Sequence, residues 1–215
     1  MRLIKLFGLV GLVMLAASLP TGAQNWRIVP GNSVGAIGRN TSEKDLIRIF
    51  GRQNVKRANI DVGEGETLPG TIVYPNDPRK RLSIVWHDPA TRAQPETITI
   101  RGKNTFWKTD RGITVGTSLK TIEMLNGGPF SMSGFGWDYS GTVMHSNRGK
   151  MRELGVQKGE EITGRTLLLR LEPAAALRRT KDYEAALGDG NFFSDHPAMQ
   201  RLNPRVYEMI IDFSL

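Results

Sequence analysis

The sequence predicts an α+β protein: two repeats, each a short helix followed by an antiparallel meander, form a mostly antiparallel sheet with short helices on one face. Three observations predict this class. Segments 40–51 and 116–127 share a helix-like pattern at a constant offset of 76 residues. Each segment precedes short runs rich in Ile, Val and Thr, which favour strands. Clusters of Gly, Pro, Asn and Asp separate those runs and indicate turns.

The first helix is predicted within residues 40–51, NTSEKDLIRIFG. Its N-terminal cap is one of three residues whose side-chain oxygen can accept a backbone N–H: Asn40, Thr41 or Ser42. Its apolar face is formed by Leu46, Ile47 and Phe50, which lie on one side of a helix. Gly51 then fits the left-handed position that ends many helices.

The second helix, within residues 116–127, repeats this arrangement. Thr117 or Ser118 caps it, and the segment from Asn126 to Pro129 ends it. The apolar stripe consists of Leu119, Ile122 and Leu125. The matched pairs are Thr41 and Thr117, Ser42 and Ser118, Leu46 and Ile122, Ile49 and Leu125, and Gly51 and Gly127. Duplication of one unit explains the match, and chance recurrence of a common capped-helix pattern is the alternative.

The predicted strands fall into two sets of four. The first set is 58–63, 70–75, 81–86 and 96–102, and the second is 129–137, 141–145, 165–172 and 205–213. Both sets contain a Gly-Thr-β-branched start, at Gly70 and at Gly141. A helix of this length is marginal alone, and a meander needs its apolar face covered, so we expect each helix to pack on the sheet.

The predicted domain boundaries follow from this pattern. We expect a first repeat in residues 24–110, beginning with an extended lead-in, and a second repeat in residues 111–215. The second repeat carries a helical insertion at about residues 172–203. In it we expect one helix with Leu177, Tyr183 and Leu187 on a single face, then a short helix that Ser194 or Asp195 caps ahead of Pro197.

Residues 1–23 have the features of a secretory signal peptide. Arg2 and Lys5 precede an apolar run over residues 6–17, and small residues follow. We expect cleavage after Ala23, a periplasmic location and no membrane span after cleavage. The alternative is an uncleaved anchor, although the run is shorter than the roughly 20 residues that span a bilayer.

Composition narrows the possible chemistry. The chain has no cysteine, which excludes disulfides, thiol nucleophiles, zinc–thiolate sites and a lipid anchor on cysteine. The net charge is +8, or +6 without Arg2 and Lys5, which favours an acidic partner. We therefore expect a protein or an anionic envelope component as partner. The basic residues are scattered without interleaved aromatics, so we expect no nucleic-acid binding.

The pattern Gly/Asn-Thr followed by two spaced apolar residues and Gly, leading into a meander, resembles the small periplasmic outer-membrane-assembly lipoproteins. The tandem form over residues 40–51 and 116–127 resembles the β-lactamase-inhibitor proteins. The chain departs from both, because it has neither the lipoprotein cysteine nor cysteine pairs. The resemblance implies a protein-binding scaffold and transfers no functional residue.

The segment GPFSMSGFGWDYSGT, residues 128–142, is the candidate ligand-binding site. Aromatic rings with one carboxylate among glycines suit a groove for a sugar or a peptide. The candidate residues are Phe135, Trp137, Asp138 and Tyr139. The alternative is a strand in which the three aromatics point to one sheet face and the glycines relieve crowding on the other.

Other chemistry-bearing residues have plainer explanations. His87, His145 and His196 lack metal-ligand spacing, and we expect them in turns. Glu64 and Glu66 can bind a cation or a basic partner, or form a solvated turn. No nucleophile elbow or phosphate-binding loop occurs. We therefore expect no catalytic residue, metal or cofactor.

Three functions are consistent with these observations, the third of which is a structural envelope protein without a ligand. The first is an exported, non-enzymatic binding or envelope-assembly protein whose partner meets the sheet face or the aromatic segment. The alternative is a periplasmic hydrolase of envelope glycan or peptide, using Asp138, Glu64, Glu66 or a histidine. Two carboxylates, or a His and a Ser, within hydrogen-bond reach in one pocket would favour the hydrolase.

Overall fold

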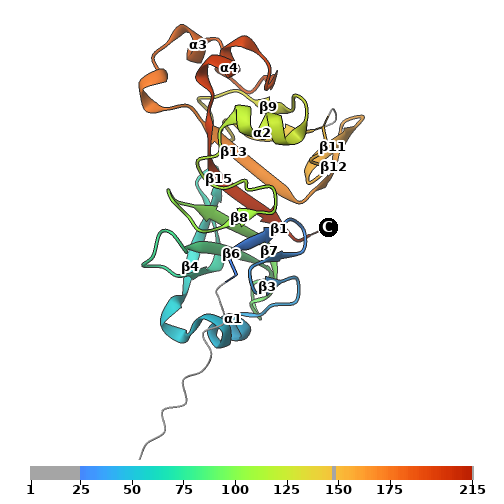
Figure 1. The fold of residues 1–215 in the computed structure, drawn as a ribbon. Helices are drawn as coiled ribbons and strands as arrows, with labels where there is room; N and C mark the ends of the chain where they lie inside the picture. Colours follow the sequence, from blue (N-terminus) through green and yellow to red (C-terminus); the bar gives the residue numbers. More distant parts are fainter. Residues whose placement is uncertain (1–24, 147–148, 215) are drawn as a thin grey trace, which may run out of the picture.

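A computed structural model describes residues 25–146 and 149–214 of the chain. Within them 43% of residues are in strands and 17% in helices, so the prediction of a mainly antiparallel α+β protein is confirmed. Figure 1 shows α1 at one end of the main sheet and α2, α3 and α4 towards the other. The predicted signal peptide lies outside the described residues.

The main sheet has six strands in the order β13-β15-β7-β6-β5-β4, and every neighbouring pair is antiparallel. The strands are β4 (Val55–Gly63), β5 (Glu66–Val73), β6 (Leu82–Asp88), β7 (Ala93–Arg101), β13 (Leu167–Glu172) and β15 (Arg205–Asp212). β4 to β7 form the expected first meander. β15 pairs with β7, so strands of both predicted repeats belong to one sheet.

The remaining strands form three smaller sheets. They are β1 (Arg27–Val29), β2 (Ser33–Val34), β3 (Ile37–Gly38) and β8 (Lys108–Thr109); β9 (Ser131–Ser133), β10 (Val143–His145) and β14 (Asn191–Phe193); and β11 (Leu154–Lys158) with β12 (Glu161–Arg165). β10 still borders the main sheet, through a bridge between Thr142 and Arg170. The expected second meander is thus interrupted by the β11–β12 hairpin and by the segment that contains β14.

Both predicted helices are present and both are capped by serine. In α1 (Glu43–Phe50), Ser42 accepts the Asp45 N–H and Asp45 accepts the Ser42 N–H, which completes a capping box. In α2 (Leu119–Asn126), Ser118 accepts the Thr121 N–H. Gly127 ends α2 in the left-handed conformation. Gly51 has φ 85° and ψ 143°, so the left-handed stop predicted there is wrong: the chain leaves α1 extended, into the short helix η1 (Arg52–Asn54).

The two helix starts dock on neighbouring strands by matching backbone contacts. Ser42 forms an antiparallel bridge with Ala93, the first residue of β7, and Ser118 forms one with Arg205, the first residue of β15. The accompanying hydrogen bonds are Glu43 N–H to Arg92 O (2.9 Å), Leu119 N–H to Pro204 O (2.8 Å), Gln94 N–H to Thr41 O (3.1 Å) and Val206 N–H to Thr117 O (2.9 Å). Each contact of the first helix therefore has a counterpart at the second.

The insertion differs from the prediction. The expected helix is broken into η2 (Ala175–Leu177) and α3 (Lys181–Glu184), and Leu187 is exposed. The break occurs because Thr180 is extended and caps a new helix, accepting the Tyr183 N–H. α4 (Pro197–Leu202) is capped by His196 rather than by Ser194 or Asp195.

The core lies on one face of the main sheet. Ile84 and Ile98 from the sheet join Leu46 of α1 and Ile122 of α2 in one buried cluster. The alternate residues face the other way, where Ile60, Ile72 and Val85 form a small separate cluster. We call this second side, which also carries Ser83, Thr97, Thr99, Arg101 and Ile210, the outer face. No helix among the described residues has the length and apolarity needed to cross a membrane.

Candidate functional site: a groove on the outer face

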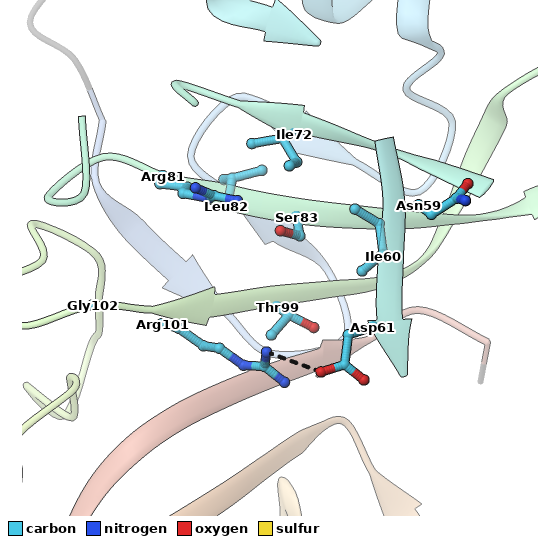
Figure 2. Close-up of a pocket in the computed structure, with 10 residues that line it drawn as sticks. All are labelled: Asn59, Ile60, Asp61, Ile72, Arg81, Leu82, Ser83, Thr99, Arg101 and Gly102. Atoms are coloured by element: carbon cyan, nitrogen blue, oxygen red, sulfur yellow. Dashed lines mark ion pairs between the residues drawn. The ribbon is translucent and has the colours of Figure 1, made fainter. Parts of the chain in front are cut away.

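A groove crosses the outer face of the main sheet. It consists of two adjoining cavities of about 380 and 250 Å³ that share Ile60, Asp61, Thr99 and Arg101. Figure 2 shows the larger cavity, with β4 crossing steeply over the strands that carry Ser83 and Thr99. We call the two cavities together the sheet groove.

The β4–β5 hairpin makes this groove because it coils over the sheet. Its tip, residues 63–65, has three successive positive φ angles, of 109°, 53° and 77°, which the two flanking glycines accept easily. A register shift between Asp61 and Gly63 adds twist just before the tip. At Gly70 a Cβ atom would lie 2.3 Å from the Ile84 carbonyl oxygen and 2.5 Å from the Ile60 side chain. The absence of a side chain at Gly70 therefore lets β4 and β5 bend closely over β6.

The larger cavity combines a polar floor with apolar walls and charged ends. The Ser83 and Thr99 side chains line it together with Ile60 and Ile72. Its charged groups are Arg81, Arg101 and Asp61. Such a mixture suits an extended peptide better than a purely apolar ligand, because each kind of partner group meets a matching surface.

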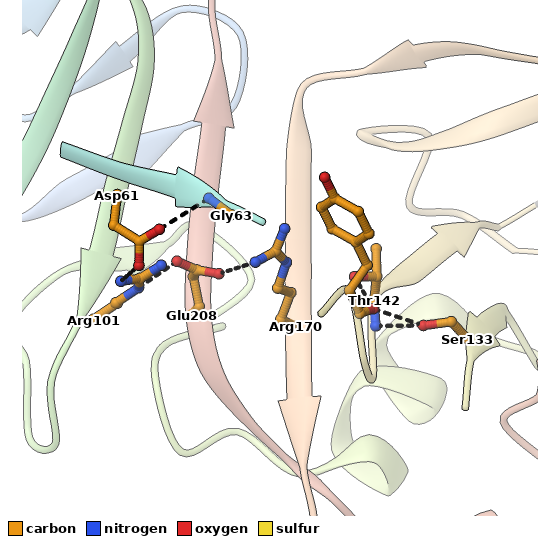
Figure 3. Close-up of polar contacts among 8 residues, drawn as sticks. Asp61, Gly63, Arg101, Ser133, Thr142, Arg170 and Glu208 are labelled. Atoms are coloured by element: carbon orange, nitrogen blue, oxygen red, sulfur yellow. Dashed lines mark hydrogen bonds and ion pairs between the residues drawn. The ribbon is translucent and has the colours of Figure 1, made fainter. Parts of the chain in front are cut away.

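A buried ion network lies beside the groove. Glu208 is fully buried, and it contacts Arg101 Nε through Oε1 and Arg170 Nη1 through Oε2, the second at 3.1 Å. Figure 3 shows Asp61, Arg101, Glu208 and Arg170 in a row across four strands. The contact of Arg170 with Glu208 is an ion pair without hydrogen-bond alignment, and Arg170 Nε is buried without a partner. The network neutralises Glu208 but leaves Arg170 incompletely satisfied.

The aromatic segment meets the hairpin tip above this network. The Tyr139 ring covers the Arg170 guanidinium, whose Cζ atom lies 5.3 Å from the ring centroid. The Tyr139 hydroxyl donates a hydrogen bond to the Glu64 carboxylate, and this contact raises the pKa of Tyr139. The loop and the hairpin tip, far apart in sequence, thus join at one end of the sheet groove.

The predicted site residues divide into one core residue and three surface residues. Phe135 is 2% exposed and stacks on Tyr183 with ring centroids 5.8 Å apart. Trp137 is 37% exposed, Asp138 is exposed and Tyr139 is partly buried. The alternative of a strand with three aromatics on one face is wrong. Only β9 is a strand there, and the chain turns at Gly136 and Gly141, which have φ angles of 85° and 67°.

The histidines lie apart from the sheet groove. The prediction that they occupy turns is wrong for His87, because β6 extends two residues further than expected, and for His145, which is the last residue of β10 and ends the strand predicted over residues 141–145. His145 lines a cavity of about 360 Å³ together with Ser131, and burial lowers the pKa of its imidazole. Among residues 25–146 and 149–214, no group of three or more His, Asp or Glu side chains could hold a metal ion.

The sequence interpretation missed Arg101, Arg170 and Glu208. A signal for two of them exists, since Arg170 interrupts the apolar run LLLRLE and Glu208 interrupts VYEMII. Opposite charges within two otherwise apolar strands predict a pair, because a buried charge needs a partner, and the strand register brings Arg170 opposite Glu208 on the outer face. No protein-family model matches the chain, and no curated protein or solved structure is significantly similar to it.

Proposed function

We propose that the protein is a non-enzymatic binding protein that takes a segment of a partner protein on the outer face of its main sheet. The observation that carries the proposal is the sheet groove, framed by the hairpin tip on one side and by the aromatic segment at one end. The resemblance to protein-binding scaffolds points in the same direction.

The outer face has the composition of an interface. Apolar side chains remain uncovered there, including Leu68 at 43% exposure and Val62 at 37%, and both line the groove. Serine, threonine and arginine side chains lie between them. The Tyr139 ring covers Arg170 at the border of this surface and meets the Trp137 ring edge to face at 5.5 Å. Exposed apolar surface beside Arg, Trp and Tyr is typical of binding sites.

We further propose an exported, periplasmic protein built by duplication of one unit, with repeats at residues 24–110 and 111–215. The matching contacts of Ser42 and Ser118 with the starts of β7 and β15 support the duplication. The two Gly-Thr pairs also support the duplication, because each threonine pairs with a neighbouring strand: Thr71 pairs with Ile84 of β6, and Thr142 forms a bridge with Arg170 of β13. Export would bring the outer face into contact with envelope proteins or polymers.

Site-specific photo-crosslinking tests the binding proposal. Leu68 on the outer face and Ile49 on α1 are similarly exposed, at 43% and 41%, so they make a matched pair for replacement by a benzophenone amino acid. Irradiation of cells that make the protein should give a discrete adduct from position 68 and none from position 49. Adducts from both positions equally, or from position 49 alone, would refute an interface on the outer face.

The hydrolase remains the second candidate, and one observation favours it. Ser131 and His145 line the same cavity, and His145 Nδ1 is buried without a hydrogen-bond partner. The acidic candidates do not join them, since Glu64 bonds Tyr139 and Asp138 lies on the exposed loop. Hydrolysis of an envelope glycan or peptide that Ser131→Ala abolishes would favour this function over binding.

A further inference from the structure

We propose that the sheet groove recognises a carboxylate side chain in an extended acidic segment of its protein partner, through Arg81 and Arg101, and that Asp61 takes the place of that carboxylate in the unbound protein. This inference rests on the proposed binding function and adds the chemistry of the partner. It depends on the positions of the two arginines and on the weak contact that Asp61 makes.

The two arginines line the same cavity from neighbouring parts of the sheet. Ser83 pairs with Thr99 in the β6–β7 ladder; Arg101 is the last residue of β7, and Arg81 lies just before β6, outside the ladder. Side chains two residues apart on a strand share a face, which places Arg101 on the outer face with Thr99. Both line the larger cavity (Figure 2).

Arg101 has donors left for a ligand. Its Nε contacts Glu208, which fixes one edge of the guanidinium against the sheet. Its Nη1 lies 3.8 Å from Asp61 Oδ2, beyond hydrogen-bond distance, and both side chains are about half exposed. A guanidinium carries five N–H donors in a planar fork and binds carboxylates best in pairs of hydrogen bonds. A partner carboxylate can therefore bind Arg101 more closely than Asp61 does.

Arg81 is exposed, and within the described residues its side chain makes no hydrogen bond or ion pair. Its charge at the cavity is thus uncompensated. The charged side chains that line the two cavities are Arg81, Arg101 and Arg170 against Asp61, Glu96 and Glu208, and Arg81 is the arginine among them that forms no ion pair within the described residues. The positive net charge of the chain adds long-range attraction for an acidic partner.

The apolar walls indicate that the carboxylate belongs to a polypeptide. Ile60 and Ile72 flank the same cavity, and exposed Leu68 continues the apolar surface into the second one. An extended segment that alternates acidic and apolar residues satisfies both surfaces at once, because alternate side chains of an extended chain point to opposite sides. Inorganic phosphate or an anionic glycan would use the arginines and leave the apolar walls without a partner.

The first test compares two capped hexapeptides, Glu-Leu-Glu-Leu-Glu-Leu and Gln-Leu-Gln-Leu-Gln-Leu, titrated into the purified protein. We expect the glutamate peptide to bind about tenfold more tightly, with a shift of the Arg101 Nε–Hε resonance. Arg81→Gln should remove about tenfold of that affinity. Arg52→Gln removes another exposed arginine, on η1, whose side chain has no partner in the described part of the chain, and should change the affinity less than twofold.

The second test uses Asp61→Asn. Asparagine keeps the oxygen that accepts the Gly63 N–H at 3.0 Å and removes the charge that competes for Arg101. We expect about threefold tighter binding of the glutamate peptide. The matched control, Asp189→Asn on an exposed loop, should have no effect. Weaker binding by Asp61→Asn would overturn the assigned role of Asp61.

The outcomes separate this inference from the binding proposal itself. Equal affinity for the two peptides, or equal losses in Arg81→Gln and Arg52→Gln, overturns carboxylate recognition and leaves an outer-face interface standing. Absence of binding by both peptides also overturns the inference. The proposed binding function then depends on the crosslinks from positions 68 and 49 alone.

Discussion

Glu208 shows how single residues shape the outer face. A fully buried carboxylate is costly unless it is paired, and Arg101 and Arg170 provide the pairing from the two neighbouring strands. The same pairing orients Arg101, so that only its outer N–H groups face the groove. A residue buried for stability thus positions the residue that we assign to recognition.

The aromatic segment offers a residue-scale prediction, because Phe135 and Trp137 are two residues apart in different environments. Phe135→Ala should lower the free energy of unfolding by about 3–5 kcal/mol, since it empties a packed core position. Trp137→Ala should cost less, about 1–2 kcal/mol, because the ring is partly exposed and the substitution removes its contact with Tyr139 and the hydrogen bond from its Nε1–H to Gly134 O.

Urea unfolding measures both variants, and the crosslink from position 68 reports on binding. Trp137→Ala should weaken that crosslink while the fold remains intact. A crosslink of normal intensity in Trp137→Ala, or a collapsed fold, would exclude the tryptophan from the site.

At the scale of elements, α1 and α2 begin in equivalent surroundings. Each starts from a serine cap that also forms a bridge to the first residue of a main-sheet strand. Because β7 and β15 are antiparallel neighbours, their first residues lie at opposite ends of the pair, so the two helix starts attach to opposite ends of one sheet (Figure 1). At both places in the chain, the helix cap and the start of the strand therefore stabilise each other.

This equivalence predicts similar effects of Ser42→Ala and Ser118→Ala. Each should lower the free energy of unfolding by about 1 kcal/mol, the usual effect of losing a cap. The double variant should show the sum, because distant sites act independently. Ser140→Ala, whose hydroxyl makes no hydrogen bond to any residue that the structure describes, serves as the control in the same thermal or urea unfolding series. A cost at one cap only would argue against equivalent docking.

The elements that could be predicted are those with local signals. Ser42, Ser118 and Gly127 act within one helical turn, so their roles follow from neighbouring residues. The strands with runs of Ile, Val and Thr could be predicted for the same reason. The interruption of the second meander could not be predicted, because Gly136 and Gly141 terminate a run that otherwise alternates like a strand.

The candidate site was only partly predictable, for a non-local reason. Of the four candidate site residues, Phe135 is buried in the core, and Trp137, Asp138 and Tyr139 lie on the loop, so their shared role in binding stays a prediction. The sheet groove depends on the coiling of β4 over β6, which Gly70 permits only in the context of Ile84 on another strand. The contact of Tyr139 with Glu64 likewise joins two turns whose spacing along the chain gives no indication that they meet.

At the scale of the whole molecule, the two faces of the main sheet have different roles. Its inner face holds the main cluster of buried apolar side chains with α1 and α2, and its outer face carries the groove, the ion network and the exposed apolar residues. Substitutions on the inner face should therefore change stability, and those on the outer face should change binding.

Amide hydrogen exchange of the protein alone and in complex with its crosslinked partner tests this division most directly. Our account predicts at least tenfold slower exchange over residues 60–70, the hairpin that borders the groove, and unchanged exchange over α1. Slower exchange in α1 or α2 with residues 60–70 unaffected would contradict a partner-binding outer face.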